Sequence, residues 1–210
     1  MVESLSGRKA QAARNDGLIL DAARAVFLAD PGAPISAVAE RAGVGISALY
    51  RRYPSKEVLL RTLCHEGLRT YCALGSAALE VADGWAGLVG FLESVVEADV
   101  HSLTVRLAGT FAPDAALLPD VWRAGEIATE LVRRAHDAGR LRGDFAASDL
   151  GLVLEACSAV TLPDPVRTVE LRRRTLALLV AGMESVGPEL PGPPPAPGEF
   201  RGRWEYRGKR

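Results

Sequence analysis

The most constraining feature of this 210-residue chain is a stretch with two short apolar patterns separated by a glycine turn. The first pattern places Val38, Ala39 and Ala42 at helical spacing, which gives a short helix one buried face. Gly43 follows directly, at a point where a helix ends most easily on a residue that accepts a positive φ angle. A second short helix is expected from about Ile46 to Arg52. The pair predicts a helix-turn-helix, whose second helix lies in the major groove of DNA.

The segment around this pair resembles the tetracycline-repressor (TetR) family of bacterial transcriptional regulators. An AGV triplet is followed by LY, then by an aromatic residue and PSKE, at fixed spacing, and the match covers roughly the first third of the chain. A later GRLRGDFAASDL stretch is similar to the turn before the family's dimerisation helices. The resemblance implies an all-α fold with an N-terminal three-helix helix-turn-helix DNA-binding domain and a larger helical ligand-binding and dimerisation domain. The residues that carry it are Ala39, Ala42, Gly43, Val44, Leu49, Tyr50, Tyr53, Pro54, Ser55, Lys56, Glu57 and Leu59.

The outward face of the second helix is the predicted reader of DNA bases. Arg51 can present two donors to a guanine, and Ser47 can contact either a base or a phosphate. The resemblance implies phosphate contacts for Tyr50, Arg52 and Lys56, although Tyr50 could instead pack in the core. The full predicted DNA-binding set is Gly45, Ile46, Ser47, Ala48, Tyr50, Arg51, Arg52 and Lys56.

Two positions depart from the family pattern. Gly45 stands where the family usually has Ser or Thr, so this position lacks a hydroxyl that could cap the helix or reach a phosphate. Ile46 stands where the family often has a polar residue, and it either packs on a thymine methyl group or is buried. These departures change the expected pattern of base contacts and leave the expected fold unchanged.

Helical periodicity continues along the chain, and no segment alternates with the period of two that a strand requires. A first helix is expected to begin at Asn15, and a long one at Ser55 that runs to about Leu79 and connects the DNA-binding head to the body. The remaining helices are expected over Trp85–Ala98, Asp99–Leu107, Leu118–Ala138, Ser148–Val160 and Pro165–Val186.

The expected organisation has four parts. Residues 1–14 form a flexible basic arm that either touches phosphates or frays. Residues 15–54 form the helix-turn-helix DNA-binding domain, and residues 55–186 the helical ligand-binding and dimerisation domain. Residues 187–210 form a tail that is Pro-rich at first and then basic and aromatic, and this tail is either disordered or in contact with nucleic acid.

Net charge is distributed unevenly along the chain. The total of −1 conceals +3 over residues 1–62, −6 over residues 63–187 and +2 over residues 188–210. A basic end on an acidic body suits a protein that offers one end to a polyanion, although an imbalance of this size also falls within ordinary surface scatter.

Several classes of protein are disfavoured. Three cysteines without a CxxC pair, no signal peptide and no apolar run of about 20 residues predict a cytoplasmic protein outside the membrane. No GxSxG, HExxH or P-loop motif occurs, so we expect no enzyme activity and no cofactor. His65 and Cys72 come closest to a metal pair, but seven residues of helix separate them by about 10.5 Å, too far for zinc, so we expect no metal.

The body is expected to contain an apolar pocket with a few polar groups for a small-molecule ligand. Glycines at 75, 87, 90, 109 and 125 weaken helix packing there and leave room. Each candidate taken singly fits the core better than a ligand contact. The predicted ligand-binding residues are Tyr71, Trp85, Phe91, His101, Arg106, Phe111 and Trp122.

Apolar stripes on the last two helices predict a homodimer through a four-helix bundle. The alternative is that both stripes are buried within one subunit. The predicted interface residues are Leu150, Val153, Leu154, Cys157, Leu176, Leu179 and Met183.

These features together predict a ligand-responsive, sequence-specific DNA-binding transcriptional regulator. Repression is the favoured sign, with release from a near-palindromic double-stranded operator by a small-molecule effector. The alternative is a helical small-molecule-binding protein or enzyme with a vestigial DNA-binding head. Steep salt dependence together with operator preference separates the two.

Overall fold

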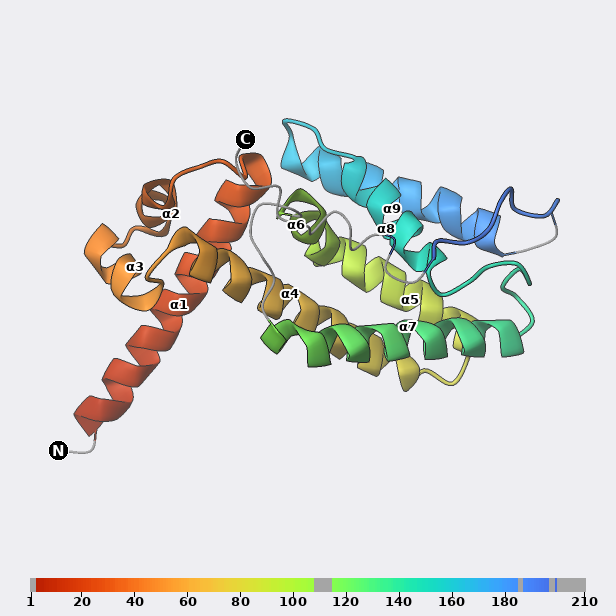
Figure 1. The fold of residues 1–210 in the computed structure, drawn as a ribbon, viewed down its shortest axis with the longest axis horizontal. Helices are drawn as coiled ribbons and strands as arrows, with labels where there is room; N and C mark the ends of the chain where they lie inside the picture. Colours follow the sequence, from red (N-terminus) through yellow and green to blue (C-terminus); the bar gives the residue numbers. More distant parts are fainter. Residues whose placement is uncertain (1–2, 108–114, 185–186, 197–198, 200–210) are drawn as a thin grey trace.

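The computed structural model describes residues 3–107, 115–184, 187–196 and 199, with the side chains of residues 3–15 and 104–106 excepted. Over these residues the chain is helical and contains no strand, which confirms the predicted all-α fold (Figure 1). The helices follow the predicted spans closely through the body. In chain order they are α1 (Glu3–Ala29), α2 (Ile35–Ala42), α3 (Ile46–Arg52), α4 (Lys56–Leu79), α5 (Gly84–Glu97), α6 (Val100–Leu107), the 3₁₀ helix η1 (Ala115–Leu117), α7 (Leu118–Asp137), α8 (Asp149–Ala159) and α9 (Pro165–Met183).

The N terminus differs from the sequence-based expectation. The sequence predicts a helix start at Asn15 after a flexible arm, whereas α1 begins at Glu3 and continues without interruption to Ala29. The segment before Asn15 contains no proline and is rich in alanine, glutamine, lysine and arginine, all strong helix formers. The expected arm is therefore a continuation of α1 that projects from the head (Figure 1).

The head is built around a core that α1, α2, α3 and the start of α4 share. Phe27 is fully buried in this core, with Val38 and Leu49 in the same cluster. Two residues of α6, Leu103 and Leu107, belong to this cluster as well. The head core therefore includes a helix that lies far along the chain from the helix-turn-helix.

The body has a second core, formed by the rest of α4 with α5, α7, α8 and α9 (Figure 1). A Cβ atom added to Gly75 of α4 would lie 2.3 Å from Cγ2 of Ile127 in α7, and one added to Gly87 would lie 2.8 Å from the Ala78 carbonyl oxygen. These two glycines were expected to leave room, but they allow close helix contact instead. Glycine at a helix crossing removes the side chain that would hold the two backbones apart.

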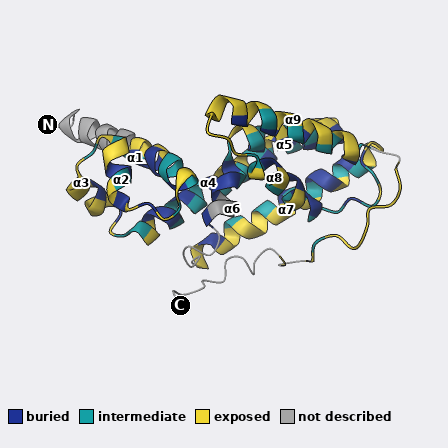
Figure 2. Cartoon of the chain, turned by 90° about the horizontal axis from the view of Figure 1, so that it is seen from above, coloured by how far each residue is buried: buried dark blue, intermediate teal, exposed yellow. Residues whose placement is uncertain are grey.

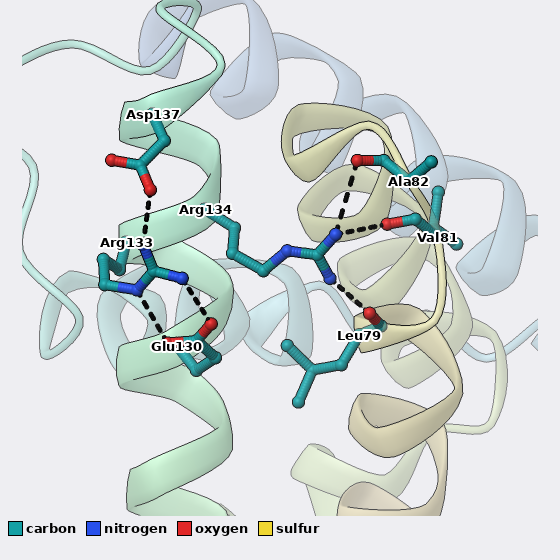
Figure 3. Close-up of polar contacts among 7 residues, drawn as sticks. All are labelled: Leu79, Val81, Ala82, Glu130, Arg133, Arg134 and Asp137. Carbon is teal, nitrogen blue, oxygen red and sulfur yellow. Dashed lines mark hydrogen bonds and ion pairs between the residues drawn. The ribbon is translucent and has the colours of Figure 1, made fainter.

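The C-terminal end of α4 is held by Arg134 of α7. Its guanidinium donates hydrogen bonds to the Leu79 carbonyl, to the Val81 carbonyl at 2.7 Å and to the Ala82 carbonyl at 3.3 Å (Figure 3). Carbonyls at a helix C terminus lack intrahelical donors, and a cation there also meets the negative end of the helix dipole. The preceding residue of α7 forms surface ion pairs instead, which join Arg133 to Glu130 and Asp137.

A buried arginine ties α9 to the start of α6. Arg172 is only 6% exposed, and it donates hydrogen bonds to Oδ1 of Asp99 at 2.6 Å and to the Val160 carbonyl at 2.9 Å. Asp99 lies between α5 and α6 with a φ angle of 49°. The start of α6 is therefore fixed to the α8–α9 pair, whereas its other end is packed in the head.

The chain beyond α9 is fastened to the loop between α7 and α8. Arg142 donates to the Pro188 carbonyl at 2.7 Å, and Oδ2 of Asp144 accepts a hydrogen bond from the Leu190 amide at 2.7 Å. Arg142 and Asp144 also pair with each other at 2.5 Å. The basic and aromatic end of the predicted tail, residues 200–210, lies outside the described residues.

Candidate nucleic-acid interface and ligand cavity

A sharp turn between α2 and α3 sets the geometry of the head. Gly43 ends α2 with φ 66° and ψ 29°, and its amide donates to the Glu40 carbonyl. The Val44 amide donates to the Ala39 carbonyl at 3.0 Å, which completes the end of the helix. Gly45 returns to an extended conformation and its carbonyl accepts the first hydrogen bonds of α3. A positive φ angle is easiest for glycine, so Gly43 determines the direction in which α3 leaves the turn.

One buried side chain orients α3 about its own axis. Leu49 is the buried residue of this helix, with 0% exposure, and Tyr53 directly after the helix is 5% exposed. Tyr50 and Ile46 are 45% and 40% exposed, so the core alternatives considered for both do not hold. The outward residues at the end of the head are Ile46, Ser47, Ala48, Tyr50, Arg51 and Arg52 (Figure 2).

Lys56, which is predicted to contact a phosphate, makes several contacts within the head. Its Nζ donates hydrogen bonds to the carbonyls of Pro31 at 2.8 Å and Ala33 at 2.7 Å, and lies 5.0 Å from the centre of the Phe27 ring. Partial burial lowers the pKa of this ammonium group. The side chain therefore fastens the turn between α1 and α2 to the start of α4.

Arg52 is likewise engaged within the head. Its guanidinium pairs with the Asp16 carboxylate of α1, and this hydrogen bond raises the pKa of Arg52. The Arg52 side chain is 59% exposed, and an exposed ion pair of this kind contributes little to stability. In contrast, Arg51 forms no ion pair or hydrogen bond with the described part of the chain. Of the predicted arginine contacts, Arg51 is the one that the fold leaves available.

A cavity of about 530 Å³ lies in the body between α4, α6, α7 and α8. This volume falls in the range of small-molecule sites. Tyr71 and His101, both predicted ligand residues, line it. The remaining lining residues are Cys64, Gly67, Leu68, Val100, Leu117, Leu118, Val121, Ala124, Ala128, Ala147, Ser148, Leu150, Gly151 and Leu154.

Three other predicted ligand residues lie away from this cavity. Phe91 is buried behind Tyr71, with the ring centres 4.9 Å apart and the planes at 84°. Trp85 is buried in the body core beneath Arg140, and Trp122 is 68% exposed on the outer side of α7. Helical periodicity distinguishes apolar from polar faces, but it does not tell a core position from a cavity wall.

The prediction for the other two residues is not tested by the structure. Phe111 and the side chain of Arg106 lie outside the described residues.

Two ionisable groups of the cavity wall, the Cys64 thiol and the Tyr71 phenol, are kept neutral by burial. Burial raises the pKa of the Cys64 thiol to about 12 and also raises that of the Tyr71 phenol. Ser148 is the N-cap residue of α8, but its side chain makes no capping hydrogen bond. Instead, the Asp149 carboxylate accepts a hydrogen bond from the Ala146 amide at 2.8 Å, at the junction of the loop and α8. The Ser148 hydroxyl is thus left at the cavity.

A second hollow, of about 650 Å³, runs between α5 and α9. Its rim carries the exposed charged residues Glu93, Glu97 and Arg173, which suits a solvated surface better than a ligand site. Among the described residues, no group of three or more His, Cys, Asp or Glu side chains is placed to hold a metal ion. None of the described helices is both long and apolar enough to cross a membrane.

Residues 19–63 match the family described as bacterial regulatory proteins, tetR family. The match spans the C-terminal part of α1, the helix-turn-helix and the first turns of α4, which supply most of the head core. The head of this chain therefore carries a helix-turn-helix segment of the tetR family.

Two relatives show how far this tetR-family likeness extends. Over 115 residues the chain is 34% identical to the HTH-type transcriptional repressor LfrR of Mycolicibacterium smegmatis, a stretch that spans 54% of this chain and 59% of that repressor. A crystal structure of LfrR from Mycobacterium smegmatis in complex with proflavine covers 84% of this chain and 99% of that one, with TM-score 0.53 and 22% identity. The match to the TetR family regulator PfmR from Thermus thermophilus covers 80% of this chain and 99% of PfmR, with TM-score 0.62 and 24% identity. The two structural matches concern the fold.

The predicted dimer stripes are part of the subunit's own core in this tetR-family fold. Of the seven predicted interface residues, six are at most 7% exposed, and Leu179 is half-buried against the same core. Six of these side chains are covered within one subunit and Leu179 is partly covered, while a homodimer through the last two helices remains a prediction. The stripes show which face of each helix is buried, but not whether the covering surface belongs to the same chain. The six buried residues are Leu150, Val153, Leu154, Cys157, Leu176 and Met183.

Sequence reasoning missed most of the cavity wall, although one pattern could have indicated it. Ala124 and Ala128 are four residues apart on α7, so both lie on the same helix face. Gly67 is a small residue that lines the cavity from α4. Small residues on two facing helices leave the space that larger side chains would fill.

Proposed function

We propose that this chain is a sequence-specific transcriptional repressor that binds a near-palindromic DNA operator as a homodimer and is released from it by a small molecule. The observation that carries this proposal is the outward face of α3. Gly43 and Leu49 fix the helix in place, while Ser47, Tyr50 and Arg51 remain exposed. These residue types suit a helix in the major groove, where arginine reads guanine and hydroxyl groups contact bases or phosphates.

A homodimer would place two such helices on one face of the DNA. With the predicted stripes buried, the remaining apolar surface of the last two helices is the candidate interface. Leu152, Ala156 and Ala159 are exposed on one face of α8, and Leu178 of α9 is 68% exposed. Two-fold symmetry would then set the two α3 helices about 34–36 Å apart, one turn of DNA.

The coupling between ligand and DNA would pass through α4 and α6. Both helices line the cavity, with Tyr71 on α4 and Val100 on α6, and both contribute side chains to the head core, with Leu63 and Leu103. A ligand that prefers a different arrangement of these two helices would change the spacing of the heads. It can weaken DNA binding only by the factor by which it prefers that arrangement.

Selection of bound duplexes from a random pool, followed by titration with the full-length protein at several salt concentrations, tests the proposal. We expect a near-palindromic consensus, a steep fall of affinity with salt and clear preference over random duplex. Arg51→Ala should lower operator affinity by roughly 5- to 100-fold and relax the preference at one base pair. Arg69→Ala, an exposed arginine of α4 in the body, is the matched control.

Equal binding to all duplexes, or no binding at low salt, would refute operator recognition and favour a small-molecule-binding protein with a vestigial head.

The dimer is tested separately by sedimentation of Leu178→Glu. This exposed position should tolerate the charge within a subunit while weakening self-association. A Leu178→Glu protein that remains dimeric at micromolar concentration would place the interface elsewhere.

A further inference from the structure

The wall of the cavity between α4, α6, α7 and α8 is largely apolar and carries a few polar groups. Leucine, valine, alanine and glycine supply most of it. Its polar groups come from Cys64, Tyr71, His101 and Ser148. Among the described residues that line it, none is Asp, Glu, Lys or Arg. The described wall therefore contains no permanent charge that could pair with a charged ligand.

The ionisable groups on α4 do not supply a negative charge near neutral pH. Burial keeps the Cys64 thiol protonated, with a pKa of about 12, and also raises the pKa of the Tyr71 phenol. Tyr71 is held edge-on by Phe91, so the ring forms a fixed part of the wall. These groups can exchange hydrogen bonds with a ligand, but they leave a buried cation uncompensated.

Transfer of an ion from water into such a site is unfavourable unless an opposite charge or several hydrogen bonds replace its hydration. We propose that this cavity binds a neutral, largely apolar molecule with one or a few hydrogen-bonding groups, and that it discriminates against ligands of either charge. The inference rests on the proposed function only in treating the cavity as the effector site. Ser148, whose hydroxyl does not cap α8, lines the cavity at the start of that helix and can donate or accept a hydrogen bond.

A matched set of tricyclic dyes tests the inference. Proflavine, which is bound in the LfrR structure, is a cation at pH 8, acridine has the same ring frame without charge, and acridine-9-carboxylate is an anion. Binding to the full-length protein is measured by fluorescence and calorimetry at pH 8, without DNA, where histidine side chains are mostly neutral. We expect acridine to bind at least tenfold more tightly than either charged dye, which corresponds to about 1.4 kcal/mol.

Two substitutions on α7 show whether the dyes occupy this cavity. Ala124 lines it, whereas Thr129 lies on the exposed side of the same helix. Ala124→Glu should weaken acridine binding and move the preference toward proflavine by at least tenfold, and Thr129→Glu should change neither. If Ala124→Glu does not fold, Ser148→Asp places a carboxylate at a helix N-cap position, where aspartate is well tolerated, and should have the same effect.

Equal or tighter binding of a charged dye to the unsubstituted protein would overturn the inference, as would failure of all three dyes to bind. Dye binding that none of the cavity substitutions alters would overturn it too. The proposed function fails by a different measurement. If acridine binds as expected but the protein shows no operator preference, the inference of a neutral ligand is supported and the repressor proposal is refuted.

Discussion

Replacement of Lys56 by methionine tests whether this residue fastens the head together or holds DNA. Methionine keeps an unbranched apolar chain but removes the ammonium group. That group donates two hydrogen bonds, of 2.8 and 2.7 Å, to the carbonyls of Pro31 and Ala33 and lies 5.0 Å from the centre of the Phe27 ring. Lys56→Met therefore leaves two carbonyls of the turn before α2 without their donor.

The expected loss of stability follows from these contacts. Hydrogen bonds from a charged donor contribute about 1.5–3 kcal/mol each, and a partly exposed cation–π contact adds about 0.5–1 kcal/mol. Lys56 is half-buried, so we take the lower end of each range. A positive charge in the first turn of α4 opposes the helix dipole by about 0.3–1 kcal/mol. The net loss of unfolding free energy should be about 3 kcal/mol, or roughly 6–12 °C in Tm for a chain of this size.

Urea and thermal unfolding of the full-length protein, followed by circular dichroism, measure this loss. Arg69→Met, which removes an exposed cation from the same helix, is the control and should change stability little. Tyrosine fluorescence and amide exchange of the head should show that the change is local to the α1–α2 turn. If Lys56→Met left stability unchanged but weakened binding to all duplexes by the same factor, the reasoning would be refuted. Lys56 would then be assigned to a phosphate contact.

Three further predictions concern the body. Gly75→Ala should destabilise the protein by about 1–3 kcal/mol in urea unfolding, because its Cβ would overlap α7. Gly90→Ala, where a Cβ meets open space, should stabilise the protein by about 0.5–1 kcal/mol. If both substitutions changed the unfolding free energy in the same direction, the packing described here would be contradicted. Arg134→Ala should lower Tm by several degrees, whereas Arg133→Ala should change it little; equal effects would show that the α4 end does not depend on Arg134. Asp144 has a pKa of about 2 because Arg142 and a backbone amide hydrogen-bond to it. Its stabilising contribution should therefore be constant above about pH 4 and fall away toward pH 2. Asp144→Asn should remove this pH dependence of stability.

Features that depend on neighbours in the sequence were predictable. The bounds of α3 agree with the expected Ile46 to Arg52, because Gly43 ends the preceding helix locally and Leu49 fixes the buried side. Ser55 caps α4 through the Val58 amide for the same kind of reason. The fold class likewise follows from periodicity that each helix shows by itself.

Features that depend on distant neighbours were not predictable. The acceptors of Lys56 lie on a turn 23 and 25 residues earlier, and nothing in the local sequence pairs them with it. The stripe that contains Leu154 indicates burial correctly, but the covering surface is the subunit's own core. The expected ligand residues were chosen as large aromatics, whereas the cavity exists because its walls carry small residues such as Ala124 and Gly151.

The core of the head has a consequence for any attempt to study DNA binding on a truncated fragment. A fragment that ended at Pro54 would lack five of the leucines that surround Phe27, and would expose the apolar surfaces they cover. Two of these come from α6, so even a fragment extended through the whole of α4 would remain incomplete. An isolated reader of DNA made from this chain needs substitutes for those side chains, or the intact protein. The missing residues are Leu59, Leu60, Leu63, Leu103 and Leu107.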